Sequence, residues 1–164
     1  MEDYLSDWDS QGILPKVFGG HDADHGSIPW QANLMLNEEQ FCGGTILSEY
    51  WVLTAAHCYN KYANYKVVVG DIDQLKDEDE DEKFKVEKFI KHKDYFLNIS
   101  DGNVVKIIND IALIKIKPKY GRGFQFNDYI QPACLPDSDA KPEPHQKYIA
   151  SGWGYTSPTG MFPI

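Results

Sequence analysis

The chain has 164 residues, of which 42% are hydrophobic and 25% are charged, a composition typical of a soluble globular protein. Its net charge of −9 argues against a nucleic-acid partner, because nucleic-acid recognition depends on Lys and Arg side chains that neutralise phosphates. No stretch approaches the roughly 18 consecutive apolar residues of a membrane-spanning helix, so no membrane partner is expected. Residues 1–12 have neither the cationic start nor the apolar core of a signal peptide.

Six short apolar runs follow one another along the chain and predict β-strands. They are rich in Val, Ile and aromatic residues and are separated by Gly, Asn and Asp, whereas helical periodicity is nearly absent. Phe84, Val86 and Ile90 follow a period of two, as expected for a half-buried strand. The runs cover residues 30–36, 42–47, 51–56, 66–69, 84–90 and 111–116. Such a series predicts an antiparallel barrel or sandwich.

The character of the sequence changes after residue 116. Proline recurs throughout this part, and residues 148–151 form its one further strand-like run. The last residues, SPTGMFPI, contain no closing element, so a second unit here would have too few strands to bury a core. We therefore expect a linker, the beginning of a second unit and a chain that is truncated.

His57 lies in TAAHC, residues 54–58, directly after the apolar run WVL and where the chain turns. A histidine in a turn is, on its own, most often a structural or solvent-exposed residue. Cys42 precedes Cys58 by sixteen residues, and a disulfide between them would clamp the turn of the histidine against the preceding strand. Closing a loop of this length would stabilise the fold by about 3 kcal/mol in the chain-entropy model.

Several motifs together resemble the chymotrypsin or trypsin family of serine endopeptidases. In chain order they are CGG at residues 42–44, TAAHC at 54–58, NDIALIKI at 109–116, QPACLP at 131–136 and SGWG at 151–154. The resemblance implies an all-β fold with a chymotrypsin-like antiparallel six-stranded Greek-key β-barrel over residues 17–130. Residues 131–164 would be the interbarrel linker and the truncated start of a second β-barrel, and residues 1–16 an activation peptide or the end of an upstream region.

The resemblance assigns the catalytic histidine to His57 and the catalytic aspartate to Asp110. An imidazole can take the proton of a serine hydroxyl during attack and return it to the leaving amine. The Asp110 carboxylate would accept a hydrogen bond from His57 and stabilise the imidazolium, in the arrangement for which this family is the standard example. The implied function is proteolysis of protein or peptide substrates by Ser-His-Asp acyl transfer, without a cofactor.

The nucleophilic serine of the family lies in GDSGGP, a string that does not occur in these 164 residues. The eight serines present have no comparable glycine setting, so we expect the chain alone to hydrolyse no peptide bond. The alternative is a non-catalytic homologue that binds partners. The presence of both His57 and Asp110 weighs against it, because binding needs neither. An unrelated disulfide-containing β domain would not explain the order of the motifs.

Residues 16–20, KVFGG, resemble the zymogen activation site of the family. Cleavage after Lys16 would release Val17 as a buried N-terminus, although Phe18 departs from the usual small aliphatic residue. An uncut extended linker is the alternative. Residues 1–15 faintly resemble the end of a complement-control module but contain no cysteine, so a disordered activation peptide is expected.

Cys134 is the odd cysteine of the three. In the family, a linker cysteine commonly pairs with one upstream of the activation site, so we expect a tether to upstream modules, with a buried free thiol as the alternative. Together with the pairing of Cys42 and Cys58, this predicts an oxidising compartment and a secreted, extracellular protein.

Two weaker patterns concern a glycan and a metal. Residues 98–100 match the glycosylation acceptor pattern, with Asn98 expected in a polar loop. Residues 70–82 overlap the loop in which trypsin-like members hold calcium, and Asp71, Asp73 and Glu82 are the candidate ligands. A solvated run of charge is the favoured interpretation of this segment.

Overall fold

A computed structural model describes residues 21–37, 39–72, 82–141 and 145–154 of the chain. Eight strands and one 3₁₀ turn form within these ranges. No helix in the described residues is long and apolar enough to cross a membrane. The elements are β1 (Gln31–Leu36), β2 (Glu39–Ser48), β3 (Trp51–Thr54), η1 (Ala56–Cys58), β4 (Tyr65–Val69), β5 (Glu82–Lys91), β6 (Phe96–Ser100), β7 (Asn103–Ile108) and β8 (Ala112–Ile116).

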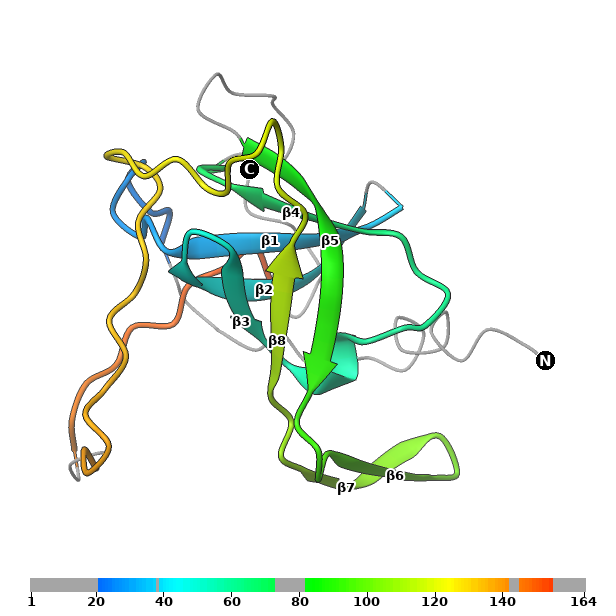
Figure 1. Cartoon of the computed structure of the whole chain (residues 1–164). Helices are drawn as coiled ribbons and strands as arrows, with labels where there is room; N and C mark the ends of the chain where they lie inside the picture. The colour runs from blue at the N-terminus through cyan, green and yellow to red at the C-terminus, as the bar shows by residue number, and fades with distance from the viewer. Residues whose placement is uncertain (1–20, 38, 73–81, 142–144, 155–164) are drawn as a thin grey trace.

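Six of the strands close into an antiparallel barrel in the order β1-β2-β3-β8-β5-β4 (Figure 1). Strand β8 enters between β3 and β5 and pairs with both, and β1 closes the barrel by pairing with β4. The prediction of an all-β fold with a six-stranded antiparallel barrel is therefore confirmed.

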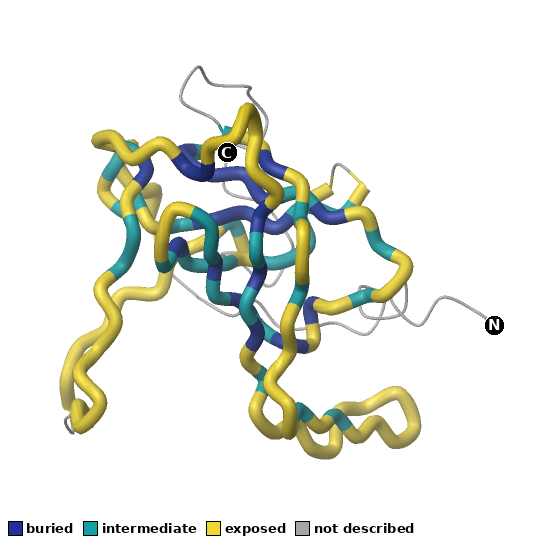
Figure 2. Tube along the Cα trace, viewed as in Figure 1, coloured by how far each residue is buried: buried dark blue, intermediate teal, exposed yellow. Residues whose placement is uncertain are grey.

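The barrel interior is filled by alternate side chains, because successive residues of a strand point to opposite faces of the sheet. Strand β8 shows this most clearly, since Ala112, Ile114 and Ile116 are buried while the residues between them are half exposed. Buried residues gather inside the barrel, and the segments beyond it are mostly exposed (Figure 2). The period of two that predicted the strands corresponds to the buried face in β8. In β5 it holds for Phe84 and Val86 but is wrong for Ile90, because the register shifts between Val86 and Lys88, so that Phe89 packs against the core and Ile90 is 45% exposed.

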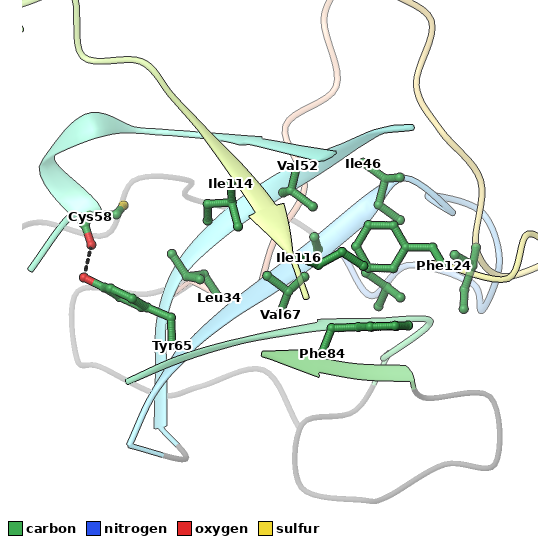
Figure 3. Packing of buried hydrophobic residues seen from close by; sticks show 13 residues of the cluster. Leu34, Ile46, Val52, Cys58, Tyr65, Val67, Phe84, Ile114, Ile116 and Phe124 are labelled. Carbon is green, nitrogen blue, oxygen red and sulfur yellow. Dashed lines mark hydrogen bonds between the residues drawn. The ribbon is translucent and has the colours of Figure 1, made fainter. Parts of the chain in front are cut away.

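Residues after β8 fill one end of the barrel (Figure 3). Phe124 is buried, its ring meets the ring of Phe84 edge to face at 5.1 Å, and its backbone N–H donates to the Glu49 carbonyl at 2.9 Å. A Cβ atom on the neighbouring Gly123 would overlap that same Glu49 carbonyl oxygen. The chain passes so close to the turn between β2 and β3 at this point that only glycine fits there.

Strands β6 and β7 form a separate hairpin, where the sequence around Asn98 predicts a polar loop. The hairpin extends from the ends of β5 and β8 away from the barrel, and most of its residues are exposed (Figures 1 and 2). Asp101 and Gly102 turn the chain with φ of 51° and 75°. An Asp-Gly pair with positive φ suits the tight turn of a hairpin.

The strand predicted at residues 148–151 does not form. Residues 146–151 have no regular secondary structure, and the Ile149 side chain is 87% exposed. A strand requires a neighbour to complete its hydrogen bonds, and this segment pairs with no strand in the described part of the chain. The apolar residues of this segment therefore do not indicate a strand.

Candidate active site

His57 lies in the 3₁₀ turn η1, which follows β3 at one end of the barrel. A disulfide joins Cys58, the last residue of η1, to Cys42 on β2, with the two Cα atoms 6.3 Å apart. The hydroxyl of Thr54, at the end of β3, donates to the Gly43 carbonyl at 2.8 Å. The residues on both sides of His57 are thus attached to β2.

Tyr65 supports the same turn from β4. Its hydroxyl donates to the Cys58 carbonyl at 2.7 Å (Figure 3). The same hydroxyl accepts the Asn60 backbone N–H. Burial raises the pKa of Tyr65, and the hydrogen bond from Asn60 opposes this rise. The phenol therefore stays neutral and fixes the chain on the C-terminal side of His57.

Asp110 directly precedes Ile111 and strand β8. Asn109 holds φ at 53°, and its side-chain amide donates to the Asp94 carbonyl at 2.9 Å. Thr54 at the end of β3 lies opposite Ala112 at the start of β8. Because β3 and β8 are paired, the residues beyond these two ends meet on the same rim of the barrel.

The side chains of His57 and Asp110 are in direct contact. His57 Nδ1 lies 2.7 Å from Asp110 Oδ2, and the His57 backbone N–H donates to Oδ1 of the same carboxylate at 2.8 Å. Since a carboxylate only accepts, the proton of the first bond belongs to Nδ1. This bond leaves Nε2 available to take or return a proton. The two side chains are 40% and 24% exposed, so the pair lies open at the surface.

Several influences act on the pKa of Asp110. Burial is the largest and raises it, but hydrogen bonds from the His57 side chain and backbone, attraction to the imidazole and a bond from the Ala56 backbone together outweigh burial. The net result is a pKa below the usual aspartate value. The carboxylate is therefore charged at neutral pH, as required to hold an imidazolium beside it.

The lowered pKa predicts how this contact depends on pH. Its stabilising contribution is fully present above the unfolded-state pKa of about 3.9 and is lost as the pH falls through the lower folded-state pKa. We expect the difference in unfolding free energy between the parent chain and Asp110→Asn to shrink as the pH falls below 4. Urea denaturation at a series of pH values measures this. A difference that stays unchanged or grows as the pH falls below 4 would contradict the prediction.

A metal does not fit beside the histidine. Cys42, His57 and Cys58 offer ligand atoms within 4.8 Å of one another, but the two sulfur atoms form the disulfide and cannot bind as thiolates. Of the calcium candidates, Asp73 lies outside the described residues and Glu82 accepts the Gln125 backbone N–H at 3.1 Å. Within the described ranges, Asp71 and Glu82 belong to no cluster of three candidate ligands.

Four further residues were singled out from the sequence, namely Cys134, Asn98, Lys16 and Val17. Cys134 is exposed with a free thiol, and Asn98 is exposed on strand β6 instead of in the loop that we expected. Lys16 and Val17 are outside the described residues.

One cavity in the described part of the chain has a volume of about 390 Å³ and is lined by Glu82, Phe84, Lys119, Tyr120, Arg122, Gly123 and Gln125. It includes neither His57 nor Asp110, and a cavity alone carries no reactive geometry.

Comparison with known proteins gives the serine protease family that the sequence motifs resemble. The family model for trypsin matches residues 17–163. The chain is 33% identical over 151 residues to "Transmembrane protease serine 9" of Rattus norvegicus, a match that covers 90% of this chain and 13% of that protein. It is also similar to the structure of mouse neuropsin, described as a serine protease expressed in the limbic system of the brain. That match has a TM-score of 0.75 and 31% identity and covers 90% of this chain and 60% of that one.

The chain belongs to the trypsin family of serine proteases. It spans 13% of the length of the rat relative and 60% of the neuropsin chain, so its match to each of them is partial.

Proposed function

We propose that the chain supplies the histidine and aspartate of a serine endopeptidase active centre. The observation that carries this proposal is the 2.7 Å contact between His57 Nδ1 and Asp110 Oδ2, together with the second bond from the His57 backbone. A carboxylate held on Nδ1 fixes the tautomer in which Nε2 is the base. In that arrangement His57 deprotonates a serine hydroxyl as it attacks a peptide carbonyl, and then protonates the leaving amine.

The nucleophilic serine is, in this proposal, not one of the serines of this chain. No serine hydroxyl in the described ranges is hydrogen-bonded to His57, and Ser151 instead donates to Gln31 at 2.8 Å. The sequence also lacks GDSGGP. The chain alone is therefore expected to be inactive, whereas the full-length protein hydrolyses peptide bonds.

The proposal extends to a secreted zymogen. The trypsin family model begins its match at residue 17, directly after Lys16, which supports cleavage between Lys16 and Val17. Exposed Cys134 would tether an upstream segment, exposed Asn98 would carry a glycan, and the disulfide of Cys42 with Cys58 fits an oxidising extracellular compartment.

Labelling by a fluorophosphonate, which reacts with an activated serine, tests the function. The full-length protein expressed from its gene, after cleavage at Lys16, should be labelled and should hydrolyse fluorogenic peptide amides. The 164-residue chain and the full-length His57→Ala variant should do neither above background.

Two outcomes would overturn parts of the proposal. Hydrolysis by the 164-residue chain, with labelling at one of its own serines, would refute the assignment of the nucleophile to other sequence. A folded and cleaved full-length protein that takes no label would refute proteolysis and favour a non-catalytic homologue that binds partners.

A further inference from the structure

The ammonium of Lys91 lies between two tyrosine rings close to the His57 turn. It is 4.8 Å from the centroid of the Tyr59 ring and 5.4 Å from that of the Tyr95 ring. Both distances fall within the roughly 6 Å over which an aromatic face attracts a cation. Lys91 thus joins two segments that are not adjacent in the sequence.

One ring belongs to the segment that carries the histidine. Tyr59 directly follows Cys58, and its backbone N–H donates to the Ala56 carbonyl at 3.1 Å and closes η1. Its ring also meets the ring of Phe89 at 5.3 Å, and Phe89 in turn lies 5.6 Å from the ring of Tyr65. The turn of His57 is therefore attached to β5 through side chains as well as to β2 through the disulfide.

The other ring belongs to the segment beside the aspartate. Asp94, the residue before Tyr95, accepts the side-chain N–H of Asn109 on its carbonyl at 2.9 Å, and Asn109 directly precedes Asp110. The pKa of Tyr95 is raised first by burial and then by the negative charge of Asp110. Lys91 itself is the last residue of β5 and lies opposite Ala112, two positions after Asp110. The next residue, His92, donates its backbone N–H to the Ile111 carbonyl at 3.0 Å.

We propose that Lys91 is a positioning residue for the contact between His57 and Asp110. By holding the Tyr59 and Tyr95 rings around its ammonium, it keeps the turn of His57 against the segment that carries Asp110. The importance of this positioning for turnover rests on the proposed function, whereas the effect on the geometry of the pair does not.

The charge of Lys91, and not only its length, is the relevant property. An ammonium can lie over aromatic faces and remain hydrated at an exposed strand end. Methionine has a similar length and flexibility but no charge, so Lys91→Met removes the attraction and keeps most of the packing. Arginine also interacts with aromatic faces, so Lys91→Arg should restore the contact.

Hydrogen exchange at the His57 backbone amide tests the proposal in the 164-residue chain, because this amide donates to Asp110 Oδ1 at 2.8 Å. Loss of two cation–π contacts in Lys91→Met should speed this exchange about tenfold, while amides in the middle of β4 keep their parent rates. Lys91→Arg should exchange within about twofold of the parent rate.

Lys61→Met is the matched control. The Lys61 ammonium lies 4.6 Å above the ring of Tyr62, the same kind of contact, but Tyr62 is 83% exposed. This control should leave the exchange of the His57 amide unchanged. An unchanged rate in Lys91→Met, or an equal acceleration in Lys61→Met, would overturn the proposal.

Kinetics of the cleaved full-length protein extend the test to turnover. Lys91→Met should lower kcat about tenfold with KM within about twofold of the parent, and Lys91→Arg should recover kcat. An inactive parent protein would contradict the proposed function, while the exchange experiment would still decide whether Lys91 holds the pair in place.

Discussion

Asp110→Asn in the cleaved full-length protein is expected to lower kcat for peptide hydrolysis by about 10⁴-fold, the loss known for this substitution in enzymes of the chymotrypsin type. The Asp110 carboxylate accepts from His57 Nδ1 at 2.7 Å. An amide can instead present its N–H₂ group to the imidazole, which favours the tautomer with its proton on Nε2. Nε2 then cannot act as the base. Steady-state kinetics with a fluorogenic peptide amide measures the loss.

Asp94→Asn is the control for this experiment. Asp94 is exposed and its carboxylate lies 2.9 Å from the Lys93 ammonium, so its replacement removes one carboxylate near the site without touching His57. Its kcat should stay within about twofold of the parent, since exposed ion pairs contribute little. If Asp110→Asn lost less than tenfold in kcat, or if both variants lost activity equally, the role assigned to Asp110 would be wrong.

Phe124→Ala should cost about 3–5 kcal/mol of unfolding free energy, the range for deleting a buried aromatic side chain. The Phe124 ring is almost completely buried at the end of the barrel and contacts Phe84, and the backbone around it is fixed by its bond to Glu49. This end of the barrel therefore has little freedom to close over a cavity. Urea denaturation of the 164-residue chain at neutral pH measures the difference.

Phe126→Ala is the matched control, because Phe126 follows two residues later and is 44% exposed. We expect it to change the unfolding free energy by less than about 1 kcal/mol. Equal losses in the two variants would show that the end of the barrel is not packed around Phe124 as described.

The barrel strands could be predicted from the sequence because their inward positions must be apolar and alternate. The run at 111–116 corresponds to β8, where Ala112, Ile114 and Ile116 all face the interior. The hairpin of β6 and β7 lacks this alternation, and both of its faces are largely exposed. Its Asp101-Gly102 turn and the Val and Ile residues of β7 were the available indications. At residues 148–151 the apolar pattern predicted a strand that does not form, because no partner strand lies beside it in the described part of the chain.

The candidate site was predictable only where a local motif carried it. His57 and Asp110 lie in TAAHC and NDIALIKI, and the contact between them is present in the structure. Tyr65 and Lys91 were not predicted, because a tyrosine at a strand start and a lysine at an exposed strand end are ordinary features of a sheet. Their relation to His57 exists only because β4 and β5 pair beside each other in the closed barrel.

The position of β8 between β3 and β5 also determines when the contact pair can form during folding. His57 and Asp110 are 53 residues apart, and the hairpin and two barrel strands separate η1 from β8 in the sequence. Barrels that depend on such distant pairings fold slowly, in milliseconds to seconds, because the entropy of loop closure must be overcome first. A chain in which β8 has not yet docked holds an isolated imidazole with no carboxylate on Nδ1. Formation of the pair therefore requires β8 to have paired with β3.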